Sequence, residues 1–407
     1  MNRVTTRSVT QHMQDLLSEK YSQLTNIQEQ LSTGKRLNRP SDNPVDVAND
    51  LKLQTTSSIL TQNAKNISDG LNFMNVSDTA MSSMDTIVQR MRELAIQGSS
   101  DTLSANDRIS MQQETQQLFR QLISLANSNY KGDYIFGGTQ SKIQPYPVES
   151  STTDTTADYQ KLHMAYFNGA ALGAGQPTQI KNAFDNTAMT NIIPGSLKIS
   201  NGATTYVEGK DYTMDYVNGI ITPTNPALAV DISDGGTFAG PNYKMGAFSI
   251  TFDRVGQGKD VYGTTVANTG NVLREIEPGI VMPVNITGQE LTVNSSTGVD
   301  MISSMIKFNQ SLLQNNQQGI SSAITDIDSV LQTVLTAQSK NGARINRFDA
   351  TQSRNDAQTT DTKSLQSNLE DVDMADAITQ FSLTENVYNA ALKAAAKTIQ
   401  PSLTDYL

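Results

Sequence analysis

Apolar residues repeat at helical spacing at both ends of the chain. Near the start they occupy heptad a and d positions, interrupted only by Lys20: Met13, Leu17, Leu24, Ile27 and Leu31. Near the end a second, nearly unbroken apolar stripe advances in steps of three and four residues: Ile378, Phe381, Glu385, Tyr388, Leu392, Ala395 and Ile399. Stripes with this period are typical of helices that pack against one another. We therefore predict two cohesive terminal helices that form an assembly interface.

Two further apolar residues follow the second stripe. Leu403 and Leu407 lie where little chain remains to cover them. Exposed apolar groups that gather in one place mark contacts with other proteins. We therefore assign both leucines to the same predicted assembly interface.

Helical spacing continues after the first helix, with clear stop and start signals. Gly34 stands where a left-handed cap would end the first helix, and Asn43 stands where a side-chain cap would begin the next. The apolar stripe of that second helix runs to Gly98, and Ser104 with Asp107 forms the capping-box pattern of a third. Four methionines recur in the second stripe and are interpreted as adaptable core filler: Met74, Met81, Met84 and Met91.

The middle of the chain changes character near Ser141. A β-hairpin is predicted at residues 129–138, and beyond it short β-rich runs alternate with turn dipeptides such as Asn218-Gly219. This composition is expected for a sandwich or barrel-like insert. Helical spacing resumes after Thr297 and continues through Ile345.

The predicted fold class is therefore α+β. A discontinuous long-helix bundle or coiled coil is formed by the N- and C-terminal segments, with a central β-rich inserted domain. The predicted domains are a terminal coiled-coil arm, a helical rod that carries the β-hairpin, and a variable β-rich insert: residues 1–42 with 366–407, residues 43–140 with 298–365, and residues 141–297.

Composition narrows the function. Of the 407 residues only 37% are hydrophobic and 6% aromatic, with no tryptophan, so the cores must be narrow helix seams. The absence of cysteine excludes disulfides and thiol nucleophiles. A net charge of −10 argues against nucleic-acid binding. No cleavable secretory signal is visible, and no apolar run approaches the ~20 residues that membrane insertion requires.

The residue types needed for catalysis do not gather in the sequence. His12 and His163 are the only histidines and lie in unrelated segments, so a zinc site or catalytic triad would have little to build on. Asp326 and Asp328 fall within a helical period and lack the glycine-centred loop of a calcium site. We predict no catalytic, cofactor-binding or metal site.

Two clusters of opposite charge mark the base of the predicted arm. If the terminal helices are antiparallel, the basic cluster after the first helix faces the acidic cluster before the last. The predicted charge pairing joins the basic and acidic residues Lys35, Arg36, Arg39, Glu370, Asp371 and Asp373. Such pairing would fix the register of a seam that could otherwise slip by one turn. Solvated, unpaired clusters are the competing interpretation.

Several motifs at both ends resemble a known family. The matching segments are residues 31–36, 39–44, 133–139, 341–347, 371–378 and 402–407. They resemble the flagellin superfamily, and within it most closely the family of hook-filament junction proteins, also called hook-associated protein three. The Arg-Pro-Ser-Asp sequence of residues 39–42 favours the junction proteins over filament flagellins. The resemblance covers about residues 1–165 and 270–407, whereas residues 168–268 match nothing familiar.

The resemblance implies a non-enzymatic structural subunit of the bacterial flagellum, placed between hook and filament. It implies self-assembly into a ring or helix and contacts with a neighbouring hook-associated protein and with flagellin. It also implies a cytoplasmic export chaperone, type III secretion without a cleavable signal, and an extracellular location. No nucleic acid, membrane insertion or cofactor is expected.

Two other functions stay open at this point. The chain could be a filament-forming flagellin, or it could be a secreted surface adhesin that binds its target through the β insert. The adhesin hypothesis predicts that deleting residues 168–268 spares motility and abolishes surface binding.

Overall fold

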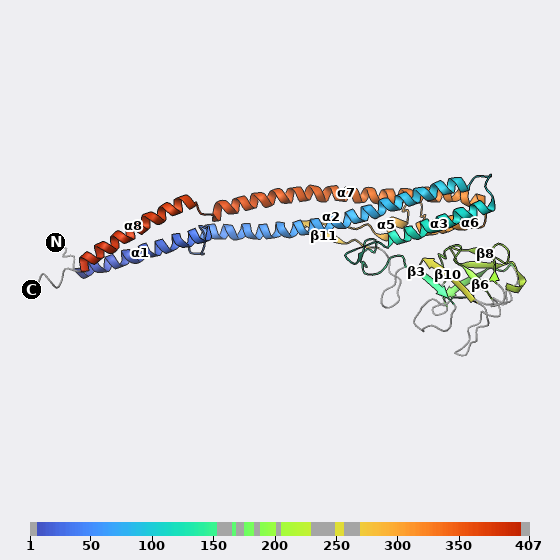
Figure 1. Cartoon of the computed structure of the whole chain (residues 1–407), viewed down its shortest axis with the longest axis horizontal. Helices are drawn as coiled ribbons and strands as arrows, with labels where there is room; N and C mark the ends of the chain where they lie inside the picture. Colours follow the sequence, from blue (N-terminus) through green and yellow to red (C-terminus); the bar gives the residue numbers. More distant parts are fainter. Residues whose placement is uncertain are drawn as a thin grey trace, which may run out of the picture. The chain divides into compact units, whose positions relative to one another are not determined.

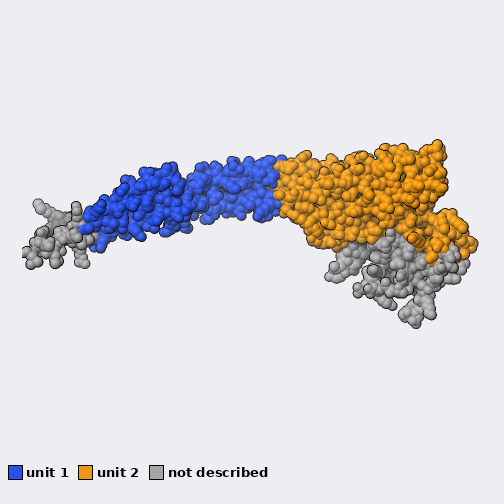
Figure 2. Space-filling model, in the orientation of Figure 1, with its two compact units in different colours: residues 1–66, 350–407 blue, residues 67–349 orange. Residues whose placement is uncertain are grey.

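The computed structural model describes residues 6–152, 165–167, 175–182, 188–200, 205–228, 249–255 and 269–399. The chain divides into two compact units, residues 1–66 with 350–407 and residues 67–349 (Figure 2). The first unit combines two segments that are far apart in the sequence, whereas the second unit is one continuous segment. The predicted α+β class with long discontinuous helices is confirmed.

The first unit contains two terminal helices and parts of two longer ones. Helix α1 spans Thr6–Thr33 and lies beside α8, Met374–Ile399 (Figure 1). The unit also holds the start of α2, Pro44–Gly98, and the end of α7, Gln317–Glu370. Gly34 ends α1 in the left-handed region with φ 73°, as its position predicted.

The predicted start of α2 is confirmed by its cap. The Asn43 side-chain oxygen accepts hydrogen bonds from the backbone N–H groups of Val45 at 3.2 Å and Asp46 at 3.3 Å. Further along α2, the Asn355 amide of α7 donates to the Leu60 carbonyl at 3.0 Å. This buried bond ties α2 and α7 together within the first unit.

The second unit continues the long helices and adds shorter ones. Helix α3, Ala105–Ala126, begins with the predicted capping box of Ser104 and Asp107. It runs back along α2, where Arg90 Nη2 lies 2.8 Å from Glu114 Oε1. Helices α5, Gly288–Thr292, and α6, Met301–Leu313, complete the helical part. The four methionines predicted as core filler are fully buried: Met74, Met81, Met84 and Met91.

One segment of α7 makes three buried contacts in this unit. Its Asn341 amide donates to the Met74 carbonyl at 2.9 Å, and its Arg344 guanidinium donates to the Asn285 carbonyl at 2.5 Å. Phe348 packs so closely on α2 that a side chain at Gly70 would place its Cβ 2.6 Å from the phenyl ring. These three contacts fix the position of α7 along its neighbours in this unit.

Two short hairpins adjoin the helices. Strands β1, Asn129–Tyr130, and β2, Asp133–Tyr134, form the predicted hairpin. Its two turn residues have positive φ, 52° at Lys131 and 84° at Gly132, as a type I′ turn requires. The second hairpin pairs β11, Leu273–Glu277, with β12, Ile280–Pro283.

The remaining strands form two four-stranded antiparallel sheets. The first has the order β3 (Val148–Thr152), β10 (Ser249–Val255), β6 (Lys198–Ser200) and β7 (Thr205–Tyr206). The second has the order β4 (Ala165–Phe167), β5 (Thr178–Asn182), β9 (Ile220–Pro223) and β8 (Tyr212–Asp215). In the pairing of β3 with β10, Val148 lies opposite Val255, and in the pairing of β8 with β9, Tyr212 lies opposite Pro223. A β-rich middle region is therefore confirmed.

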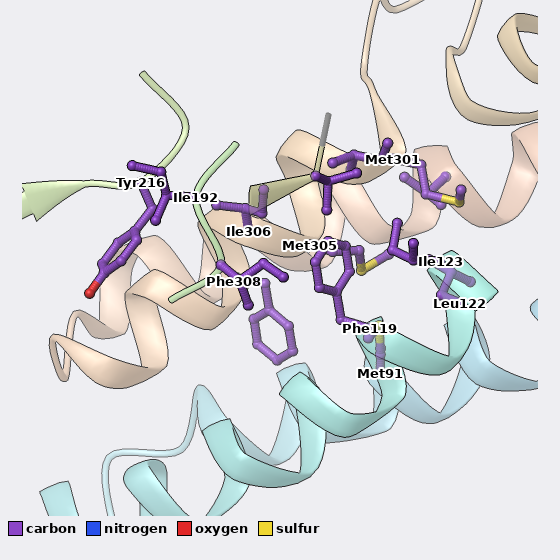
Figure 3. Packing of buried hydrophobic residues seen from close by; sticks show 14 of the residues in the cluster. Met91, Phe119, Leu122, Ile123, Ile192, Tyr216, Met301, Met305, Ile306 and Phe308 are labelled. Carbon is purple, nitrogen blue, oxygen red and sulfur yellow. The ribbon is translucent and has the colours of Figure 1, made fainter. Parts of the chain in front are cut away.

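The β region and the helices share one hydrophobic core. Figure 3 shows Ile192 and Tyr216 of the β region in the same cluster as Phe308 of α6 and Phe119 of α3, and all four are buried. Polar contacts support the packing. The Gln310 and Gln314 amides of α6 and its C-terminal cap each donate to the Met214 carbonyl at 3.0 Å.

The shared core changes how the adhesin hypothesis can be tested. Removing residues 168–268 would take Ile192 and Tyr216 out of the core and expose the face of α6 that they cover. Such a deletion would therefore unfold more than the insert, and lost surface binding would not report on the insert alone.

Candidate assembly interface

The α1 side of the terminal helix pair follows the predicted heptads. From Gln11 onward the predicted a and d residues are half-buried, whereas most residues between them are exposed. These half-buried positions are Met13, Leu17, Lys20, Leu24, Ile27 and Leu31. Lys20, the one polar member, is half-buried too, and its ammonium donates to the Gln23 side chain at 2.9 Å. The structure thus brings the predicted α1 residues together against α8.

The α8 side of the pair uses a different face from the predicted stripe. The residues that α1 covers recur in alternating steps of four and three: Ala377, Phe381, Thr384, Tyr388, Ala391 and Ala395. Phe381, Tyr388 and Ala395 belong to the predicted stripe, and the Tyr388 ring lies 6.1 Å from that of Tyr21. Ile378 and Leu392 turn away from α1 and stay exposed.

Three predicted residues near the C-terminus cannot be placed. Leu403 and Leu407 lie outside the described residues, and the side chain of Ile399 lies outside them too. Their assignment to the interface stays a prediction.

Helix α8 leaves large apolar side chains uncovered on both flanks of its contact with α1. At 100° per residue, Met374, Ile378 and Leu392 fall on one flank, and Leu383 and Val387 fall on the other. Leu383 is the most exposed of them, at 65%. A helix that is apolar on three sides needs more than one neighbour to cover it. We call these five side chains the α8 flanks.

A compact turn connects α1 to α2. Asp42 accepts hydrogen bonds from the backbone N–H groups of Asn38 at 3.0 Å and Arg39 at 2.8 Å. Arg39 in turn forms an ion pair with Glu29 at 2.7 Å. The Arg-Pro-Ser-Asp sequence is therefore a self-contained turn, in which the aspartate holds the backbone and the arginine reaches back to α1.

Backbone hydrogen bonds join this turn to the segment between α7 and α8. The Arg36 N–H donates to the Glu370 carbonyl at 2.5 Å, and the Val372 N–H donates to the Gly34 carbonyl at 3.0 Å. Together they make an isolated antiparallel bridge between Lys35 and Asp371. We call residues 34–43 with 370–373 the elbow.

Of the six charged residues predicted to pair at the elbow, the side chains of only two meet. Lys35 Nζ lies 2.5 Å from Glu370 Oε2. Arg36 instead contacts Asp46 and the Leu369 carbonyl, both at 3.0 Å. The two remaining acids serve their own segments: Asp371 accepts a hydrogen bond from Ser367, and Asp373 caps α8 by accepting from the N–H groups of Ala375 and Asp376.

This geometry predicts which charge reversals compensate. Lys35→Glu should destabilise the first unit by about 1–2 kcal/mol, less than for a fully buried pair because the ammonium is half exposed. The double variant Lys35→Glu with Glu370→Lys should regain most of that loss, as measured by thermal unfolding followed by circular dichroism. Arg36→Glu with Asp371→Lys is the matched control and should show no recovery, because these two side chains bind other partners.

Neither a metal site nor a membrane span was found in the part of the chain that the structure describes. There, no cluster of three histidine or carboxylate side chains is arranged to hold a metal ion. No helix in the same ranges is both long enough and apolar enough to cross a bilayer.

Long terminal helices that pair with each other and leave apolar flanks exposed define a structural protein of the assembly-forming class. The bacterial flagellin N-terminal helical region matches residues 4–141, and the bacterial flagellin C-terminal helical region matches residues 318–407. Together the two matches cover more than half of the chain. The chain belongs to the bacterial flagellin family, whose members are structural and non-enzymatic proteins of the flagellum.

Individual relatives agree with this family. A flagellin of Listeria innocua is 30% identical over 177 residues, which are 43% of this chain and 61% of the relative. The chain therefore spans about three fifths of the length of that relative. A flagellin of Clostridium tyrobutyricum is 24% identical over 365 residues, which are 87% of both chains.

Two of the solved structures to which the chain is similar are of hook-associated proteins. One from Vibrio parahaemolyticus, described as a flagellar hook-associated protein, has a TM-score of 0.48 at 15% identity and covers 81% of this chain and 100% of its own. The flagellar hook-associated protein-3 of Legionella pneumophila has a TM-score of 0.36 at 15% identity and covers 79% of this chain and 98% of its own.

Proposed function

We propose that this protein is the structural subunit that joins the flagellar hook, through another hook-associated protein, to the flagellin filament. Its membership in the flagellin family supports a role in the flagellar tube. The Arg-Pro-Ser-Asp turn of residues 39–42, which resembles that of the junction proteins, favours the junction over the filament. In the structure this turn is anchored by Asp42 and by the Arg39–Glu29 ion pair.

The observation that carries an assembly role is the exposure of the α8 flanks. Five large apolar side chains on one helix remain uncovered although α1 already occupies the third side. Burying one such side chain contributes about 1.5–3 kcal/mol, so contacts at both flanks could hold a subunit in a tube. We infer that neighbouring subunits cover these flanks.

The proposal divides the chain by task. The arm, residues 1–42 with 366–407, makes the contacts between subunits. No contact between subunits is assigned to the other two parts. These are the rod, residues 43–140 with 298–365, and the insert, residues 141–297. The partners are further copies of this chain, another hook-associated protein and flagellin. A cytoplasmic chaperone that holds the chain before export is a further proposed partner.

Immunogold electron microscopy of the cells that make this protein tests the junction. An antibody against the chain should label a narrow band where hook and filament meet. Cells that lack the gene should keep their hooks and release flagellin into the medium. Label along the whole filament would contradict the proposal.

A filament-forming flagellin is the second candidate function. The full-length similarity to the Clostridium tyrobutyricum flagellin, over 87% of both chains, favours it. The same labelling experiment separates the two roles, because a filament subunit occupies the entire filament.

Substitution of Leu383 tests the assembly interface directly. Leu383→Asp should leave the monomer folded, because this side chain is 65% exposed and lies off the contact with α1. It should raise the concentration needed for polymerisation at least about tenfold, since a buried leucine is replaced by a charge. Sedimentation of polymer from a dilution series measures this concentration.

Ser382→Asp is the matched control, with the same charge placed one residue away at an exposed polar position. It should polymerise nearly as the native chain does. Equal polymerisation of the two variants would show that Leu383 stays exposed in the assembly.

A further inference from the structure

Two carboxyl groups are buried side by side at the elbow with a single lysine. Asp50 of α2 is 8% exposed and Glu370 of α7 is 5% exposed. They share the amide of Gln54, which donates to Asp50 at 2.7 Å and to Glu370 at 3.2 Å. The Lys35 ammonium lies 2.5 Å from Glu370.

The hydrogen bonds around the two acids are unequal. Glu370 accepts from Lys35, from Gln54 and from Gln366 at 2.9 Å. Asp50 accepts only from Gln54, and its Oδ1 atom is buried with no hydrogen-bond partner among the described residues. An unpaired buried carboxylate oxygen is costly, whereas a proton on it would make it a donor to the neighbouring acid.

We propose that Asp50 and Glu370 share one proton beside Lys35, and that this proton closes the elbow between the terminal helices α1 and α8 and the long helices α2 and α7. With the proton in place, one carboxylate faces one ammonium, and the three side chains of Asp50, Glu370 and Lys35 carry no net charge. Without it, two carboxylates face a single ammonium. This shared proton is a property of the monomer, so the proposal holds whether the subunit belongs to a junction or to a filament.

The charges facing the pair agree with this assignment. Burial and, after it, the adjacent Glu370 raise the pKa of Asp50 to about 6, while Gln54 and Lys35 oppose the shift. The hydrogen bond with Asp50 holds the pKa of Glu370 down at about 2. The hydrogen bond to Glu370 raises the pKa of Lys35, and the nearby charges of Asp50 and Asp371 raise it too.

The direction of the pH effect follows from these shifts. The pKa of Asp50 is higher in the closed elbow than its ordinary 3.8, so its stabilising effect is complete below pH 3.8 and is lost as pH rises through about 6. The pKa of Glu370 is lowered, so its contribution is present above its ordinary 4.5 and is lost as pH falls toward 2. The elbow is therefore tightest near pH 5.

Hydrogen exchange of the full chain, followed by mass spectrometry of peptides from the elbow, tests the proposal. The reporters are the Arg36 and Val372 N–H groups, whose hydrogen bonds close the elbow. After correction for the intrinsic exchange rate, opening should be about tenfold more frequent at pH 7.5 than at pH 5. Equal opening at the two pH values would overturn the proposal without any variant.

Two matched variants separate the shared proton from other causes. Asp50→Asn keeps the shape and stays neutral, so its opening should be independent of pH and about tenfold rarer than in the native chain at pH 7.5. Asp361→Asn removes an exposed carboxylate from α7 and should keep the native pH dependence. If Asp50→Asn keeps the native pH dependence, or if Asp361→Asn removes it, the shared proton is not the cause.

Discussion

Truncation of Phe308 to alanine is expected to lower the free energy of unfolding of residues 67–349 by about 3–5 kcal/mol. Phe308 is fully buried in the cluster that α6 shares with α3 and the β region (Figure 3). Its removal leaves a cavity that neighbours from three parts of the fold cannot all fill. The loss should therefore destabilise helices and strands together.

Urea unfolding followed by two signals measures this. Far-ultraviolet circular dichroism reports the helices, and near-ultraviolet circular dichroism reports the buried tyrosines of the β region, since the chain has 13 tyrosines and no tryptophan. Both transitions should shift equally for Phe308→Ala. Leu335→Ala, at a 40% exposed position of α7, should shift neither by more than about 1 kcal/mol. A shift in the helical signal alone would mean that the insert folds independently.

Replacement of Gly219 by alanine is expected to cost about 3 kcal/mol or more. The turn between β8 and β9 holds Gly219 at φ 67°, where a side chain is strained, and its added Cβ would lie 1.7 Å from the Met189 carbonyl oxygen. Relief of this overlap must move the backbone. That movement endangers the hydrogen bond from the Ile180 N–H to the Gly219 carbonyl at 2.9 Å.

Gly279→Ala is the matched control, because Gly279 has φ 76° and no atom within 4 Å of an added Cβ. It should cost only the backbone strain of about 1–2 kcal/mol. The difference between the two variants in urea unfolding isolates the close approach of two chain segments. If both glycines cost the same, the contact with Met189 contributes nothing.

The helix ends that were predicted correctly depend on residues that are close together in the chain. Asn43 and Ser104 start helices in the structure because a capping side chain reaches only two or three residues ahead. Gly34 ends α1 because it alone among its neighbours tolerates positive φ at no cost. The heptads of α1 also survive, since polar residues fill most of its other positions, with Leu16 and Tyr21 as exceptions.

Helix α8 shows where periodicity stops being informative. Apolar residues occupy three of its sides, so a stripe that includes Ile378 and Leu392 fits helical spacing as well as one that includes Ala377 and Ala391. The small residues Ala377 and Ala391 let α1 approach closely. Which face of α8 packs against α1 therefore depends on α1 as well as on α8. The pattern along α8 alone held no such information.

The charge partners at the elbow and the shared core were likewise decided by the tertiary structure. Opposite charges near the same end of two helices predicted a contact, and the pair that meets is Lys35 with Glu370. The burial of Asp50 was not predicted, because a single aspartate in a polar stretch of helix is expected to be solvated. It is buried only because α7 covers it.

The sequence by itself determined where α1 and α2 end, where α2 and α3 begin, which face of α1 is apolar, and that the middle is β-rich, because each depends on neighbours within a few residues. The tertiary structure decided which face of α8 meets α1, which acid holds Lys35, and that the β region completes the core around Phe308. The physical reason is distance along the chain. Contacts between residues some 300 positions apart depend on helix rotation and register, which no local pattern encodes.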